Sequence, residues 1–226
     1  MRHTSPPAPT TRSASTRPTG HTRHTRQEQK QQTRQSLLDA GLRLLDHQSL
    51  SSLGLREVTR AAGLTPTAFY RHFASLSELG VALVEEAFVP LRGLVRDLRN
   101  ADAPEDATVV IDRTVDVTAR HVAQNPAHFR FVTREWQGGV REVREAIADR
   151  LGDFADDLVD YLSGLPDTAG WSREDLRMLA DLYVDHMVLT AARLLDAADP
   201  ADRERITATA RRQLQVINLG RRAWPR

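Results

Sequence analysis

Cysteine is absent from the 226 residues, so the chain has neither a disulfide framework nor a thiolate metal site. Aromatic residues make up only 5% of it. No stretch of about eighteen consecutive apolar residues exists, which excludes a membrane-spanning helix. The arginines near the start are not followed by an apolar run, so a secretory signal is not expected. We therefore expect a soluble cytoplasmic protein of one large domain, or of a small and a larger one, with no membrane partner.

Net charge is small, because 31 Lys and Arg are set against 30 Asp and Glu. The two signs are nevertheless separated along the chain. Residues 1–74 contain 11 basic and four acidic residues, a balance of +7, whereas the remainder contains 20 and 26, a balance of −6. A basic front suggests that this part of the chain binds a polyanion. A solubilising tail would account for the beginning of the chain, but not for the stretch that follows it.

Acidic residues are missing from residues 1–26, and apolar ones are few; Thr, Ser, Pro, Arg and His predominate. Such a segment cannot bury enough apolar surface to offset the entropy lost on ordering, so we expect a disordered basic arm. Its histidines, His3, His21 and His24, have no fixed geometry on such an arm. We predict no metal site.

Strand-like alternation is missing as well, and helical periodicity runs between breaks at Pro, Gly and Asn. Thr65 before a proline and Ser75 three residues before a glutamate are typical helix N-caps, and Gly63 is typical of a helix end. We therefore predict an all-α protein. The predicted helices run from 27, over 55–62 and 66–73, from 76 towards 100 with a bend at Pro90, and over 104–124, 126–134, 139–163, 172–198 and 200–223.

The segment "AAGLTPTAFYRHF" at residues 61–73 carries more polar chemistry than a packing helix needs. Phe69 and Phe73 are four residues apart, so on a helix they share one face and pack inward. A short helix, a glycine turn and a second helix with outward hydrogen-bond donors form the helix-turn-helix plan, whose second helix enters the major groove. The outward residues are Thr67, Ala68, Tyr70, Arg71 and His72. The same turn occurs in helical proteins that never bind DNA, but the +7 balance of this region favours DNA.

The longer segment "LREVTRAAGLTPTAFYRHFASLSELG" resembles the DNA-binding part of TetR-type repressors, over roughly residues 30–92. In that family the Tyr and His of this motif commonly hold phosphates, and they match Tyr70 and His72. Ser77 stands about where many members have a lysine, which puts one backbone contact in doubt. The DNA-binding residues that we predict are Arg26, Lys30, Arg34, Arg56, Thr65, Thr67, Ala68, Tyr70, Arg71 and His72.

The resemblance implies a three-helix DNA-binding domain at residues 27–92, with its helix-turn-helix at about 55–74, and a larger helical domain at residues 93–226 for effector binding and dimerisation. Apolar stripes at 176–195 and 206–220 would supply a four-helix interface between two subunits. The alternative is that both stripes face the core of their own subunit.

Aromatic and aliphatic residues of the second domain are candidates for an effector pocket, although such residues in a bundle are commonly core. Arg130 and Arg134 lie four residues apart, and together they would suit an anionic head group. A surface salt bridge with Glu135 or another acidic neighbour is the competing explanation. The predicted pocket residues are Phe129, Arg130, Val132, Arg134, Trp136, Phe154, Tyr183 and Met187.

Two segments also resemble a narrower branch of the family, the FabR and DesT type of fatty-acid regulator; they are "LREVTRAAGLTPTAFYRHF" and "QNPAHFRFVTRE". In that branch a long-chain acyl thioester is the signal. This resemblance implies a homodimeric repressor on a near-palindromic operator in double-stranded DNA, modulated by a small hydrophobic effector such as an acyl-CoA, with the sign of the effect left open. The alternatives are a TetR-like regulator of efflux or catabolic genes with an unrelated apolar ligand, and a DNA-binding protein without an effector.

Catalytic motifs are missing. Asp185 and His186 form an adjacent acid–base pair, but no nucleophile accompanies them, and a histidine hydrogen-bonded at an interface explains them better. The chain contains no H-E-x-x-H, G-x-S-x-G, P-loop or G-x-G-x-x-G. We predict that the protein is not an enzyme and needs no cofactor.

Overall fold

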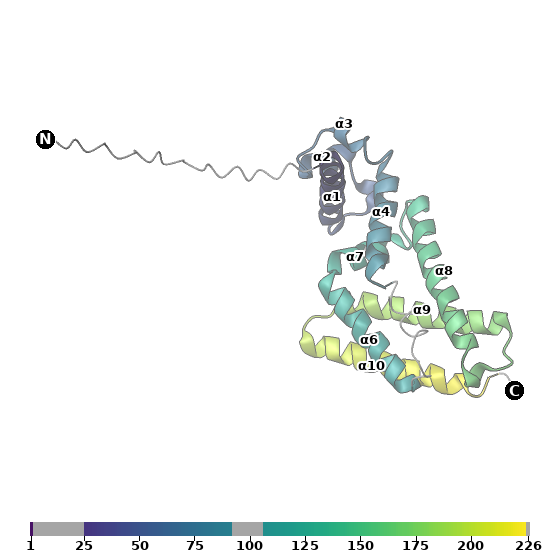
Figure 1. Ribbon diagram of the computed structural model, residues 1–226. Helices are drawn as coiled ribbons and strands as arrows, with labels where there is room; N and C mark the ends of the chain where they lie inside the picture. The colour runs from purple at the N-terminus through teal and green to yellow at the C-terminus, as the bar shows by residue number, and fades with distance from the viewer. Residues whose placement is uncertain (2–24, 92–105, 225–226) are drawn as a thin grey trace.

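The computed structural model describes residue 1, residues 25–91 and residues 106–224, and every regular element in these parts is a helix. The all-α prediction is confirmed. Figure 1 shows helices α1 to α4 gathered at one end of the molecule and α6 to α10 forming the remainder. The predicted basic arm lies outside the described residues except at its two ends.

The first half begins with the long helix α1 and continues through two short helices to α4. Thr25 and Glu28 form a capping box at the start of α1, so this helix begins one residue earlier than predicted and includes Arg26. Ser75 caps α4 by accepting a hydrogen bond from the N–H of Glu78. The bounds are α1 Arg26–Leu45, the 3₁₀ turn η1 Leu50–Ser52, α2 Leu55–Ala61, α3 Pro66–Phe69 and α4 Leu76–Phe88.

The second half is a bundle in which α8 packs on α9, and α10 packs on both α6 and α9. Helix α4 reaches from the first half onto α7 and α8. The predicted helix from 76 gives way to a 3₁₀ turn at Val89–Leu91, where the bend at Pro90 was expected. Its predicted continuation towards residue 100 lies outside the described residues. The bounds are η2 Val89–Leu91, α6 Ala107–Gln124, α7 Pro126–Glu135, α8 Arg141–Ser163, η3 Pro166–Thr168, α9 Arg173–Leu195 and α10 Pro200–Arg221.

The largest hydrophobic core is shared by the two halves. Leu37, Val58 and Phe69 of the first half belong to the same buried cluster as Val143 of the second. Gly80 of α4 marks the closest approach: a Cβ added there would lie 2.5 Å from a methyl carbon of Leu50 and 2.8 Å from one of Val143. The glycine therefore lets η1, α4 and α8 meet.

The two predicted apolar stripes face mainly inward. Leu179 and Leu194 of α9 and Leu214 of α10 are buried within their own subunit. Other apolar side chains of the same helices are exposed, namely Met178, Leu182, Leu189, Val216 and Leu219. None of the helices in the described part has the length and hydropathy needed to cross a membrane.

Candidate DNA-binding face and effector cavity

The turn between α2 and α3 is fixed by its backbone. Gly63 has a φ of 68°, a left-handed conformation that glycine adopts without a steric penalty. The N–H of Leu64 then bonds to the carbonyl of Thr59 at 2.8 Å. The hydroxyl of Thr65 accepts from the N–H of Ala68 at 3.2 Å and caps α3. This hydroxyl is engaged by the backbone, so its first role is to orient α3.

Helix α3 is shorter than predicted. Regular α-helix ends at Phe69, and beyond it the chain tightens: the N–H of His72 bonds to the Phe69 carbonyl three residues back, at 2.8 Å. The predicted division into two faces holds. Phe69 and Phe73 are buried with ring centroids 5.6 Å apart, while the Tyr70 side chain is 62% exposed. Among the other predicted contacts, Thr67 and Arg71 are exposed, and Ala68 and His72 are half-buried.

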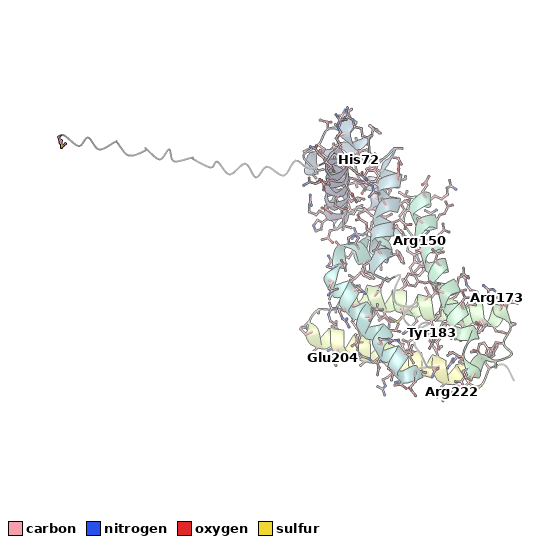
Figure 2. The ribbon with its side chains drawn as sticks, in the orientation of Figure 1. His72, Arg150, Arg173, Tyr183, Glu204 and Arg222 are labelled. Atoms are coloured by element: carbon pink, nitrogen blue, oxygen red, sulfur yellow. The ribbon has the colours of Figure 1, made fainter. Side chains whose placement is uncertain are left out.

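Cations from α1 and from the end of the α3 turn gather around His72. Burial lowers the pKa of His72 first, and the nearby charges of Lys30, Arg34 and Arg71 lower it further. The Arg34 guanidinium also lies 5.0 Å from the centroid of the Phe73 ring. Segments far apart in the sequence thus form one positive surface, at the end of the molecule where Figure 2 labels His72. Arg26 and Arg56 are exposed on α1 and α2.

An apolar cavity of about 220 Å³ lies between the end of α4 and the helices of the second half. Its wall extends from Ala87 and Phe88 at the end of α4 to Asn218 and Arg221 at the end of α10. Five residues of the predicted pocket set line it: Phe129, Val132, Phe154, Tyr183 and Met187. Burial raises the pKa of the Tyr183 hydroxyl. The cavity has the apolar lining expected for a hydrophobic effector.

Arg130 and Arg134 do not line this cavity, and their predicted placement in its wall is wrong. The Nη1 atom of Arg130 lies 2.8 Å from Oδ1 of Asp46 and lowers the pKa of that carboxyl group. Arg134 donates to the backbone carbonyls of Leu45 at 2.7 Å and Gln48 at 3.0 Å. Carbonyls at a helix C-terminus have no partner within the helix, so a guanidinium satisfies them. For Arg130, the competing explanation of a salt bridge is correct.

Trp136 was also predicted in the pocket wall, but it packs against the core shared by the two halves. Its neighbour Glu135 was considered only as a salt-bridge partner for Arg130 and Arg134, and its structural role was missed. Glu135 is buried, and its Oε1 atom accepts from the N–H of Leu50 at 2.8 Å. Helix α7 therefore shows two faces: Phe129 and Val132 border the cavity, while Arg130, Arg134 and Glu135 hold the end of α1 and η1. We call these three residues the α7 latch.

Arg221 is the second residue that the sequence analysis missed. Its residue surface is only 5% exposed, and it lines the cavity at the end of α10. A signal did exist, because Arg221 stands seven residues after Leu214 and four after Ile217, on the predicted apolar stripe. A charged residue on such a stripe indicates either a buried ion pair or a ligand contact.

Comparison with known proteins agrees with this architecture. Residues 37–83 match the family described as bacterial regulatory proteins, tetR family. An HTH-type transcriptional regulator of Haemophilus influenzae is 35% identical over 190 residues, which cover 83% of this chain and 89% of the relative.

Two solved structures share the fold. The fatty acid degradation regulator FadR from Bacillus halodurans has a TM-score of 0.65 and 14% identity, over 82% of this chain and 94% of its own. FadR from Bacillus subtilis in complex with stearoyl-CoA has a TM-score of 0.64 and 13% identity, over 81% and 96%. The family match and the bacterial relative, on this fold, show that the chain belongs to the tetR family of bacterial regulatory proteins and is a DNA-binding transcriptional regulator.

Proposed function

We propose that the protein is a homodimeric repressor whose affinity for a near-palindromic operator changes when a long-chain acyl compound enters the cavity. One observation carries this proposal: α7 forms part of the cavity wall on one face and holds the DNA-binding half with the other. An occupant that favours one position of α7 would therefore favour one position of the DNA-binding face.

The DNA-binding face has the charge and shape that a duplex requires. Thr67 stands in the first turn of α3, where a short side chain allows approach to base edges, and Tyr70 and Arg71 lie at its end. Lys30 and Arg34 flank them from α1 and suit backbone phosphates. Deletion of the predicted basic arm, residues 1–26, should lower the dependence of DNA affinity on salt concentration, because the arginines of this arm add non-specific contacts to phosphates.

The exposed apolar residues of α9 and α10 supply the dimer surface. Met178, Leu182 and Leu189 follow each other at steps of four and seven, so they share one face of α9. Val216 and Leu219 share a face of α10. A lone subunit leaves these side chains in water, whereas pairing with a second copy buries them and places two recognition helices about 34 Å apart, one turn of DNA.

An acyl chain suits the cavity because its wall is apolar over nearly its whole length. The FadR structure with stearoyl-CoA supports this class, because that protein shares the fold. Acyl thioesters of increasing chain length should change operator affinity with increasing potency, since each buried methylene contributes about 0.8 kcal/mol until the cavity is full. Titration of such a series in an operator-binding assay is the test. A flat response would favour an unrelated apolar effector, and no response to any apolar compound would favour a regulator without one.

The α7 latch can be tested separately from ligand binding. Arg134→Ala removes bonds to the end of α1 and leaves the cavity wall intact. We expect this variant to bind an active acyl compound as the wild type does, but to transmit less of its effect to DNA. Arg141→Ala is the control, because Arg141 is exposed and pairs with Glu145 of its own helix at 3.3 Å. Full transmission in Arg134→Ala would exclude the latch as the coupling element.

A further inference from the structure

Arg221 places a cationic side chain against an otherwise apolar cavity. Its Nη2 atom donates to Oδ1 of Asn218 at 2.8 Å and lies 3.3 Å from Oδ2 of Asp167. Its buried Nε atom has no hydrogen-bond partner among the residues that the structure describes. A buried guanidinium hydrogen that lacks an acceptor is costly, which indicates that an acceptor is supplied by something else.

The charge of Arg221 is also incompletely balanced. The Asp167 oxygen that faces Arg221 lies 3.4 Å from Nε of Arg222 as well, so one carboxylate serves two guanidinium groups. Arg222 is exposed and can be neutralised by solvent and salt, whereas Arg221 cannot. The end of the cavity at α10 is therefore a place where a single additional negative charge is favoured.

The other described residues that line the cavity are uncharged. Among the described residues of its wall, Arg221 is the only one with a charged side chain. Phe88 of α4 and Phe129 and Val132 of α7 also line the cavity, and Figure 1 shows α4 and α7 at a distance from the end of α10. The wall thus combines one cationic side chain with an otherwise largely apolar surface, the pattern that complements a molecule with one anionic head and one alkyl chain.

We propose that Arg221 binds the carboxylate of an unesterified long-chain fatty acid, with the alkyl chain directed towards Phe88 and Phe129. This rests on the proposed function for the alkyl chain, and adds the head group and its orientation. A carboxylate carries one charge and matches one guanidinium. A coenzyme A head carries several phosphate charges, and the described wall offers no further cation to receive them. In this orientation, the tail contacts α4 and α7, the helices that connect with the DNA-binding half.

The test compares three ligands with the same twelve-carbon chain, chosen for solubility: dodecanoate, dodecanol and dodecanoyl-CoA. Binding of each to the full chain is measured by titration calorimetry. We expect the wild type to bind dodecanoate at least about tenfold more tightly than dodecanol, as a buried charge-assisted hydrogen bond provides. Arg221→Gln should abolish this preference and leave dodecanol binding unchanged. Arg222→Gln is the matched control and should keep the preference.

A second variant should raise the affinity for dodecanoate instead of lowering it, and it leaves the buried arginine in place. Asp167→Asn takes away the carboxylate that competes for Arg221, so dodecanoate should bind several-fold more tightly and dodecanol equally. Equal affinity of acid and alcohol for the wild type, or an unchanged preference in Arg221→Gln, would overturn the assignment. If dodecanoate binds but its affinity does not depend on Arg221, only this inference fails; if none of the three ligands binds, the proposed acyl effector fails as well.

Discussion

The candidate DNA-binding face and the candidate effector cavity are built in different ways. The recognition surface is concentrated in one stretch, residues 65–72, with a supporting contribution from α1. The cavity is lined by residues from six α-helices, spread along the chain between Ala87 and Arg221. In the first half, side-chain roles follow from helical spacing and one glycine turn; in the second, they follow from tertiary packing. The comparison teaches that a local surface is easier to recognise in sequence than a cavity lined by several helices.

The largest expected difference between the two regions is the loss of stability when a phenylalanine is replaced by alanine in each. Phe69 is fully buried beneath the recognition turn, so Phe69→Ala should cost about 3–5 kcal/mol of stability. Phe154 borders the cavity, where part of its surface already faces empty space, so Phe154→Ala should cost clearly less. Denaturant unfolding of both variants measures this.

Operator binding separates the two variants further. Phe69→Ala should lose DNA binding, because Tyr70 and His72 depend on the position of this ring, whereas Phe154→Ala should keep it. Equal destabilisation by the two substitutions would mean that the cavity is as tightly packed as the core beneath α3, and the contrast between the halves would fail.

The junction of the halves gives the next largest effect. Gly80→Ala should destabilise the protein by about 1–3 kcal/mol, because the new methyl group must displace Leu50 or Val143. Gly220 is the control: it lies on α10 with nothing within 4 Å of an added Cβ, so Gly220→Ala should be neutral or stabilising by up to about 1 kcal/mol. Thermal unfolding of both variants is the measurement. A neutral Gly80→Ala would show that the junction is not rigidly packed.

Three arginines show which side-chain contacts could not be predicted from the sequence. The fold and the inward direction of Phe69 and Phe73 follow from periodicity, which depends only on neighbours along the chain. Arg130 and Arg134 were expected in the pocket wall because they lie among aromatics, but each partner lies more than eighty residues away, near the end of α1. The partner of Arg221, Asp167, is likewise distant in the sequence, and the cavity that Arg221 borders is formed by tertiary packing. No local pattern specifies which distant group a long cationic side chain reaches.

A smaller effect distinguishes two kinds of DNA contact within the recognition region. Tyr70→Phe should weaken binding to all operator variants by a similar factor, around fivefold, as expected for the loss of one phosphate hydrogen bond. Thr67→Ala should alter the order of preference among operators and leave non-specific DNA binding unchanged. A panel of operators with single base changes tests both. Uniform weakening by Thr67→Ala would remove the distinction between backbone and base contacts.

The smallest predicted effect is a dependence of DNA binding on pH through His72. Its pKa is depressed by burial and by Lys30, Arg34 and Arg71, so the free protein keeps this imidazole neutral below the ordinary histidine value of about 6.5. Stability from this residue is therefore lost as pH falls from about 6.5 towards the depressed pKa, because the unfolded chain takes up the proton more readily.

DNA reverses the balance at His72. A phosphate placed among these cations favours the charged imidazole and raises its pKa, so binding is coupled to proton uptake, and operator affinity should rise as pH falls through this range. Each unit by which the phosphate raises the pKa is worth at most about a tenfold gain in affinity, and half a unit gives about threefold. His72→Gln isolates the effect, because the two proteins differ at this residue alone. Operator affinity measured at constant salt from pH 7.5 to 5.5 should rise about threefold more in the wild type than in His72→Gln. Parallel profiles would mean that no phosphate approaches this imidazole, and that the cations of α1 and α3 hold the backbone without it.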